Sequence, residues 1–397
     1  MPERAEITLP ACPATIARGQ GESQYVVSEK RKRNYILCIP VFCRLLSLLP
    51  RTLSDVILEA RKTSTGPVHV SSCPPVIRGV YSFHWRDTMA SFSVTFSNVL
   101  LMLLYLLPGF FLCRCKKVRP EHLSTPSVIL LYVCGPGMFL NALIDLDVSP
   151  MLTARMGLFI LFSLAGETAL MLLILLLLGK RRKEFSTRML SIASVMSNVG
   201  FFGMPVVRAL FPDAPEAAVY SCMFNVSLNI VAWTVGVFTL TGEKKYISLR
   251  AAVVNPSVLA AAGGFVLYLL KANTWLPELI HGGFRTLGAM STPLCMLILG
   301  IRLATMNPKK LFTTPLVWLI CAGKLLVFPL FCWALTLPFA LDPVFRGSIL
   351  ILAATPCASI LLNLAEIHHN GQELAANCAL LSTLLSIVTI PLLSLLT

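Results

Sequence analysis

Two stretches of the chain could carry chemistry, because both are poor continuous helices inside long apolar segments. The first is Ser197–Pro205 (SNVGFFGMP) and the second is Ala353–Ser359 (AATPCAS). Proline removes a backbone donor and clashes with the preceding turn, and glycine weakens a helix further. If the helices break here, half-helix N-termini bring partial positive charge into the membrane, where an anion can use it. We therefore predict an anion site at two broken helices; two kinked packing helices are the alternative.

The predicted ligands are backbone groups of the breaks and the polar side chains beside them. Uncharged side chains at Asn198, Ser359 and Asn363 can donate and accept hydrogen bonds. The predicted substrate-binding residues are Asn198, Gly200, Gly203, Pro205, Pro356, Ser359, Asn363 and Lys324. Secondary candidates, for which interhelical hydrogen bonding is the alternative, are Asn141, Asn225 and Asn229.

Ionisable residues inside apolar segments are costly in a membrane and mark function. Glu167 and Lys324 are two such residues, and they pair with each other, bind substrate or carry a proton, unless Lys324 only caps a broken helix. Glu366, followed by His368 and His369, is a second candidate for proton or ion coupling, with a solvated helix end as the alternative. Arg208, one turn after Pro205, faces a cavity mouth or anchors the helix at the membrane interface.

The elements that must position these residues are membrane helices. Of the 397 residues, 56% are hydrophobic and 13% charged, against about 25% charged in soluble domains. Ten apolar segments are long enough to cross about 30 Å of hydrocarbon. They lie near 91–113, 126–144, 154–178, 189–211, 216–240, 251–271, 283–305, 312–338, 346–367 and 374–396.

The basic residues sit between these segments, which is typical of membrane topology and not of a nucleic-acid-binding face. Odd-numbered connections hold fifteen: Arg114, Lys116, Lys117, Arg119, Lys180, Arg181, Arg182, Lys183, Arg188, Lys244, Lys245, Arg250, Arg302, Lys309 and Lys310. Even-numbered connections hold four: Arg155, Lys271, Arg285 and Arg346. We predict cytoplasmic odd connections, both termini outside the cytoplasm, and a location in the plasma membrane.

Three landmarks recur along the chain and indicate an internal repeat. Pro136 and Pro293 are 157 residues apart, as are Glu167 and Lys324, while Pro205 and Pro356 are 151 apart. Because each half holds five spans, the second half enters from the opposite side. The predicted fold is all-α, with ten transmembrane helices in two inverted five-helix repeats, residues 89–240 and 241–397, and with helices four and nine broken.

Residues 1–88 differ from the rest: they are mixed in composition and hold twelve of the 33 Lys and Arg residues. We predict a poorly ordered extension, with the native start at Met89 as one explanation. The seven cysteines inside apolar segments act as small hydrophobes, and Cys113 and Cys115 have no metal-ligating partners nearby. No nucleophile–base pair, metal spacing or phosphate loop is present, so we predict no enzyme, no metal and no cofactor.

Five motifs together resemble the auxin efflux carrier family of permeases, particularly its bacterial members. They are SNVGFFGMPVV (197–207), NPSVLAAAGGFVLYLL (255–270), STPLCMLILGIRLA (291–304), ATPCASILLNLAEIHHNG (354–371) and LSTLLSIVTIPL (381–392). Asn198, Pro205 and Pro356 fall at family-like positions, whereas Glu167 does not match a family marker. The resemblance implies crossed broken helices four and nine, a scaffold of spans 1, 2, 6 and 7, and a mobile domain of the others.

The resemblance also implies small organic anions as substrates: auxin in plants and dicarboxylates such as malonate and malate in bacteria. Only residues 241–250 separate spans five and six, which favours the bacterial type. The leading hypothesis is therefore a permease for small organic anions of the dicarboxylate type, working by alternating access around the broken helices. A sodium-coupled symporter and a non-transporting membrane sensor stay open, as does a homodimer.

Overall fold

The computed structural model describes residues 85–306 and 308–397, and every regular element within them is a helix. The predicted N-terminal extension lies outside the described residues, apart from 85–88, which already belong to the first helix. The elements of the first half are α5 (Trp85–Arg114), η2 (Pro120–Leu123), α6 (Ser124–Ile129), η3 (Leu130–Cys134), α7 (Gly135–Ile144), α8 (Pro150–Leu177), η4 (Gly179–Arg181), α9 (Phe185–Ala193), η5 (Val199–Gly203), α10 (Met204–Leu210), α11 (Glu216–Val231), η6 (Ala232–Gly236) and α12 (Val237–Thr241).

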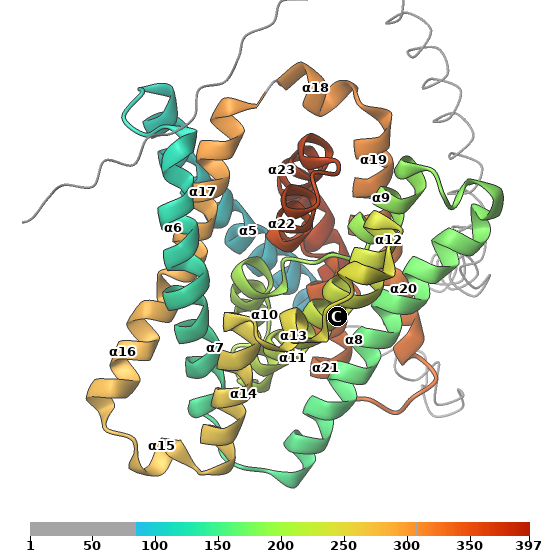
Figure 1. Ribbon diagram of the computed structural model, residues 1–397. Helices are drawn as coiled ribbons and strands as arrows, with labels where there is room; N and C mark the ends of the chain where they lie inside the picture. The colour runs from blue at the N-terminus through green and yellow to red at the C-terminus, as the bar shows by residue number, and fades with distance from the viewer. Residues whose placement is uncertain (1–84, 307) are drawn as a thin grey trace, which may run out of the picture.

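The second half continues in the same way, and its elements pack beside those of the first (Figure 1). They are η7 (Lys244–Tyr246), α13 (Leu249–Val253), α14 (Pro256–Leu269), α15 (Ala272–Trp275), α16 (Glu278–Ala289), α17 (Ser291–Thr305), α18 (Pro308–Thr313), α19 (Pro315–Ala322), η8 (Gly323–Val327), α20 (Phe328–Thr336), α21 (Pro343–Ala354), α22 (Ser359–Ile367) and α23 (Gln372–Ser394).

Eight helical stretches of the described chain are long and apolar enough to cross a membrane, so the prediction of an all-α membrane protein is confirmed. They are Ala90–Arg114, Glu121–Ile144, Pro150–Leu177, Glu216–Thr241, Lys244–Leu269, Glu278–Thr305, Pro315–Thr336 and Gln372–Ser394. The other two predicted spans, 189–211 and 346–367, consist of shorter helices joined by non-helical backbone.

Most helices fall into two contact groups, which contacts of α5 with α10 and α23 connect. In one group α5 packs along α17, and α7 packs against both α14 and α16. In the other, α8 contacts α11 and α20, while α21 contacts α20 and α23. The first group lies mainly to the left in Figure 1 and α8 and α20 to the right, with α10, α22 and α23 between them.

Aromatic side chains fill the core of the second group. Phe159 of α8 stacks on Tyr220 of α11, with ring centroids 4.6 Å apart. Phe345 of α21 meets Phe159 edge-on at 4.8 Å and Tyr220 at 5.3 Å. All three rings are fully buried, and such pairs stabilise packing beyond the area they bury. This cluster fixes α21, and therefore the segment after it, against α8 and α11.

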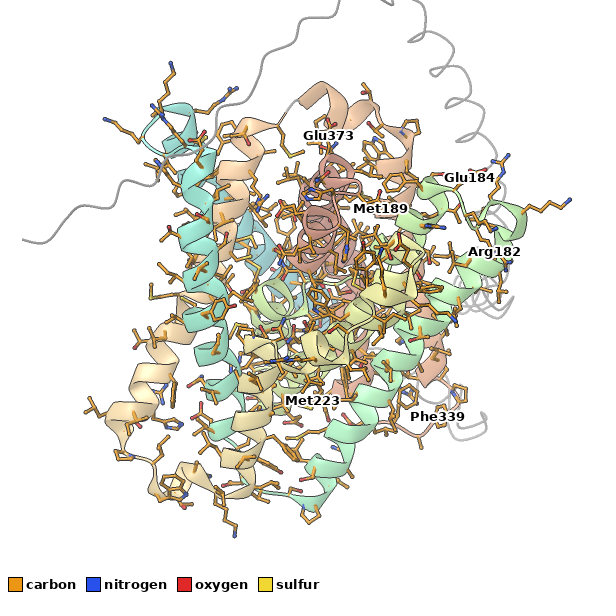
Figure 2. All side chains as sticks on the ribbon, in the orientation of Figure 1. Arg182, Glu184, Met189, Met223, Phe339 and Glu373 are labelled. Atoms are coloured by element: carbon orange, nitrogen blue, oxygen red, sulfur yellow. The ribbon has the colours of Figure 1, made fainter. Side chains whose placement is uncertain are left out.

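Figure 2 shows the side chains on this arrangement of helices. Arg182 and Glu184 lie in the turn between α8 and α9, at the periphery, and Arg182 is exposed. Met189 of α9 and Met223 of α11 lie in the interior and are buried. Apolar side chains on α5 and α14 remain exposed, which suits a helix surface covered by lipid.

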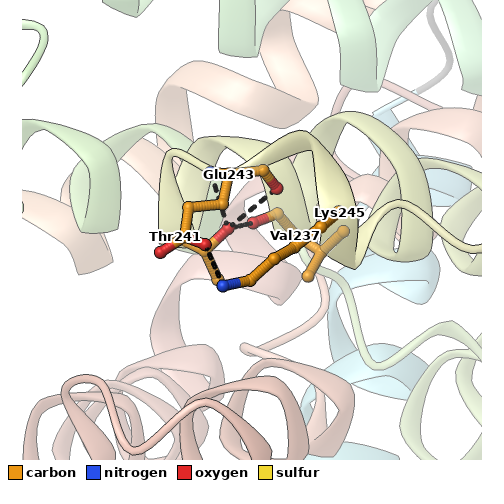
Figure 3. A network of polar contacts seen from close by, with 4 residues as sticks. All are labelled: Val237, Thr241, Glu243 and Lys245. Atoms are coloured by element: carbon orange, nitrogen blue, oxygen red, sulfur yellow. Dashed lines mark hydrogen bonds and ion pairs between the residues drawn. The ribbon is translucent and has the colours of Figure 1, made fainter.

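A tight turn joins the two halves of the chain. The α12 helix ends at Gly242, whose φ of 79° requires the left-handed conformation that glycine adopts at no steric cost. Thr241 donates from Oγ1 to the Val237 carbonyl at 2.8 Å and accepts from the Glu243 amide at 3.2 Å (Figure 3). Glu243 in turn pairs with Lys245 (Figure 3). The connection is therefore short and locally closed.

Candidate functional site

The two non-helical stretches lie directly against each other. Residues 194–198 separate α9 from η5, and 355–358 separate α21 from α22. The amide of Asn198 donates to the Pro356 carbonyl at 2.9 Å, and the amide of Ala358 donates to the Met196 carbonyl at 3.1 Å. These bonds form an isolated antiparallel bridge between Ser197 and Cys357. Two segments about 160 residues apart in sequence thus pair inside a helical protein.

Neighbouring hydroxyls satisfy the other backbone groups that the interruptions leave free. Ser382 of α23 accepts from the Cys357 amide at 2.9 Å, and Ser221 of α11 donates to the Val199 carbonyl at 2.6 Å. Ser197 donates to the carbonyl of Ala353, at 3.4 Å. Because buried backbone groups need partners, these serines stabilise irregular backbone where no water reaches it.

The first interruption does not lie at the proline and glycines that predicted it. Pro205 is in the first turn of α10, where a missing amide donor costs little. Gly200 and Gly203 belong to the π-helical turn η5, and the non-helical residues come before them. A Cβ on Gly203 would meet Leu352 at 2.7 Å, so this glycine permits close packing against α21. In the second stretch Pro356 lies inside the non-helical residues 355–358.

A cavity of about 320 Å³ opens between the first helix group and α10. Its walls come from α5, α7, α10, α16 and α17, and Pro205 and Pro293 both line it. The polar and charged residues of the lining are Asn98, Tyr105, Asn141, Arg208, Arg285 and Thr292. No carboxylate lies among the lining residues of the described chain, so the cavity is electropositive.

The two arginines of the cavity differ in whether another side chain already pairs with their charge. Arg208 makes no ion pair or hydrogen bond with any described residue. Arg285 lies 3.6 Å from Glu278, which lowers its net charge in the cavity. Asn141 is 7% exposed, and its Oδ1 accepts no hydrogen bond within the described structure. Arg208 and Asn141 therefore have unused capacity to bind a ligand.

Of the eight predicted substrate-binding residues, Pro205 is the one that lines this cavity. Asn198 and Lys324 are buried, and Gly200 and Gly203 are inside η5. Ser359 and Asn363 are exposed on one face of α22, one turn apart. Their roles stay predictions.

Sequence reasoning missed most of the cavity lining. The sequence predicts Arg208 either at a cavity mouth or at the membrane interface, and the structure places it on the cavity lining. Arg285, Asn98, Tyr105 and Thr292 are not among the predicted site residues, although a polar residue such as Asn98 inside an apolar span is a usable signal. Thr292 donates to the Phe201 carbonyl at 2.8 Å and so ties α17 to η5. Of the secondary candidates, Asn141 lines the cavity, whereas Asn229 bonds the Asn225 carbonyl within its own helix.

The predicted coupling residues lie in two places. Glu167 is fully buried in α8, and neither carboxyl oxygen accepts a hydrogen bond of good geometry. Glu366 is exposed at the end of α22 and lies 3.5 Å from Arg302 of α17. His368 packs edge-on against Tyr246, with centroids 4.5 Å apart, and partial burial lowers its pKa.

Comparisons with known proteins match this chain to membrane transporters. A family model described as "Membrane transport protein" matches residues 93–394. An uncharacterized transporter of Methanothermobacter thermautotrophicus is 26% identical over 307 residues, covering 74% of this chain and 96% of the relative. An uncharacterized transporter of Methanocaldococcus jannaschii is 24% identical over 305 residues, covering 74% and 96%. A protein of Rhizobium meliloti named "Putative malonate transporter" is 23% identical over 295 residues, covering 71% and 89%.

Proposed function

We propose that this chain, which belongs to the membrane transport protein family of auxin efflux carriers, is a secondary transporter of small organic anions in the plasma membrane. The family model covers most of the chain, so the resemblance read from the five motifs is confirmed. One observation carries the substrate class: an electropositive cavity of about 320 Å³ beside the paired interruptions. That volume is at the small end of ligand pockets. The malonate named for the Rhizobium relative is an anion of suitable size and charge.

The mechanism we propose is alternating access by relative movement of the two helix groups. The cavity lies where α5, α7, α16 and α17 of the first group face α10, which also contacts α11 and α21 of the second group. In this mechanism α10 moves together with the second helix group. The movement exposes the cavity first to one side of the membrane and then to the other. We propose in addition that the ten spans form an inverted repeat, with the interrupted segments as spans four and nine. Each half of such a repeat contributes helices to both groups. Cytoplasmic odd connections and a homodimer remain predictions of the sequence.

Uptake into proteoliposomes tests the proposal. Liposomes containing the purified full-length chain are offered labelled malonate, malate, succinate and indole-3-acetate. We expect saturable uptake of at least one dicarboxylate above that of empty liposomes, inhibited by the unlabelled anion. Binding of an anion detected by thermal shift, without flux in either direction, would instead support a membrane sensor. A folded, monodisperse protein that neither binds nor carries any of the anions would contradict the proposal.

The Arg302–Glu366 pair joins α17 of the first helix group to α22 and acts as a gate in this mechanism. Arg302 belongs to α17 and Glu366 to α22, with the charged atoms 3.5 Å apart. Half-exposed pairs contribute about 0–1 kcal/mol, so Glu366→Gln changes the open–closed ratio by at most about fivefold. We expect a changed uptake rate with an unchanged melting temperature, and partial recovery in the Arg302→Glu/Glu366→Arg double variant. Additive effects of the two single changes would show that the pair is not coupled.

A further inference from the structure

Lys324 is a fully buried cation with one hydrogen bond. It lies in the π-helical turn η8, and its side chain has 0% exposure. Its Nζ donates to the Ala353 carbonyl at 2.5 Å and lies 5.0 Å from the centroid of the Phe328 ring. Within the described residues it forms no ion pair. A buried charge in a membrane is costly, so this placement calls for a compensating negative potential.

The ends of two half-helices supply part of that potential. Ala353 lies in the last turn of α21, and Ser194 caps the C-terminus of α9. Gly323, the neighbour of Lys324, is so close to Ser194 that an added Cβ would lie 2.6 Å from its Oγ. Helix C-termini carry partial negative charge from unpaired carbonyl groups. The Lys324 ammonium therefore binds at the negative end of α21, and the backbone beside it approaches the C-terminal cap of α9.

Glu167 is a second buried ionisable group that interacts with this site. Its carboxyl is fully buried in α8 and interacts electrostatically with Lys324, although the two are not ion-paired. The Ser227 hydroxyl beside this carboxyl donates to Ser163 Oγ at 2.8 Å or to the Phe224 carbonyl. The carboxyl thus has no hydrogen-bond partner of good geometry, and Lys324 is a charged residue that acts on it electrostatically.

We infer that Lys324 is a tethered substitute for a coupling cation. In transporters with interrupted helices, unwound carbonyls and half-helix C-termini coordinate the coupling sodium ion or proton. Here the chain's own ammonium group binds such a carbonyl, and Ser197 Oγ, 3.4 Å from the same oxygen, completes the contact. The paired interruptions are therefore electrostatically balanced without a cation from solution. This inference rests on the proposed transport function and deepens it: the anion moves without sodium.

The competing explanation is a structural cap, and two substitutions separate it from a charge role. Lys324→Gln keeps a donor for the Ala353 carbonyl and removes the charge. Lys324→Ala removes both and leaves room for a small cation. We expect uptake by Lys324→Gln in sodium-free buffer to fall at least about tenfold, because a hydrogen bond from a charged donor is lost. We expect sodium, lithium or methylammonium ions to raise uptake by Lys324→Ala and to leave the wild type unchanged.

The experiment measures anion uptake into proteoliposomes in sodium chloride and in N-methylglucamine chloride, with Lys117→Ala as control because Lys117 is exposed. Wild-type uptake that requires sodium would overturn the inference and leave the proposed transport intact. Wild-type levels of uptake by Lys324→Gln would also overturn it, in favour of a cap. If Lys324→Ala does not fold, Lys324→Gln decides alone. No uptake of any anion by the folded wild type would overturn the proposed function itself.

Discussion

Replacing Arg208 by glutamine is expected to lower anion uptake by at least about tenfold, since a hydrogen bond to a charged group contributes about 1.5–3 kcal/mol. Arg208 lines the cavity from the last turn of α10 and forms no ion pair or hydrogen bond with a described residue. Its full charge is therefore available to an anion. Glutamine keeps a polar side chain of similar reach, so the loss measures the charge.

Arg285 provides a comparison within the same cavity. Because Glu278 lies 3.6 Å from its guanidinium, Arg285 has less charge to offer, and Arg285→Gln should weaken uptake less than Arg208→Gln. Initial rates over a range of malonate concentrations give kcat and KM, and we expect mainly a raised KM for both variants. Arg182→Gln, in the exposed turn after α8, is the control and should match the wild type. Equal uptake by Arg208→Gln and Arg182→Gln would exclude the cavity as the anion site.

The sequence predicted the membrane helices well because length and apolarity decide them. Eight of the ten predicted spans coincide with the eight spanning helices of the described chain, with ends that differ by seven residues or fewer. The predicted position of the first helix interruption, within Ser197–Pro205, is a few residues too late in the chain, since the non-helical residues are 194–198. Gly200 and Pro205 weaken a helix by themselves, but residues 194–198 lose helical backbone because Pro356 and Ala358 offer them alternative partners. Such a tertiary contact has no local signal in the sequence.

The cavity was harder to predict than the helices. Its lining comes from five helices, so that Asn98 and Arg285 become neighbours of Arg208 only through packing. In the sequence Arg285 is one more basic residue in a connection. By contrast, Lys324 and Glu167 were recognisable from the chain alone, because charge inside an apolar span has few structural explanations. The sequence thus reveals residues whose type is unusual for their segment, such as a charge in an apolar span. It does not reveal residues of ordinary type that become neighbours only through folding.

The second large effect concerns the contact that forms one wall of the cavity. Gly300 of α17 and Gly109 of α5 allow the two helix backbones to approach each other. A Cβ on Gly300 would lie 2.0 Å from the Leu106 carbonyl oxygen, and one on Gly109 would lie 2.1 Å from that of Leu297. Both neighbours are backbone atoms of helices, which cannot move aside as a side chain would. We therefore expect Gly300→Ala to destabilise the protein by about 1–3 kcal/mol, the usual cost of overpacking, or more.

Gly157 is the matched control, because it lies within α8 with nothing within 4 Å of an added Cβ. Gly157→Ala should be neutral or stabilising by up to about 1 kcal/mol, as alanine is the better helix former. Thermal unfolding in detergent should therefore show a lowered midpoint for Gly300→Ala alone, and equal midpoints would contradict the close contact. Asn98 and Tyr105 on α5 face the cavity together with Thr292 on α17. Separating the two helices moves these walls apart, so Gly300→Ala should also raise the KM for the anion even at temperatures where the variant remains folded.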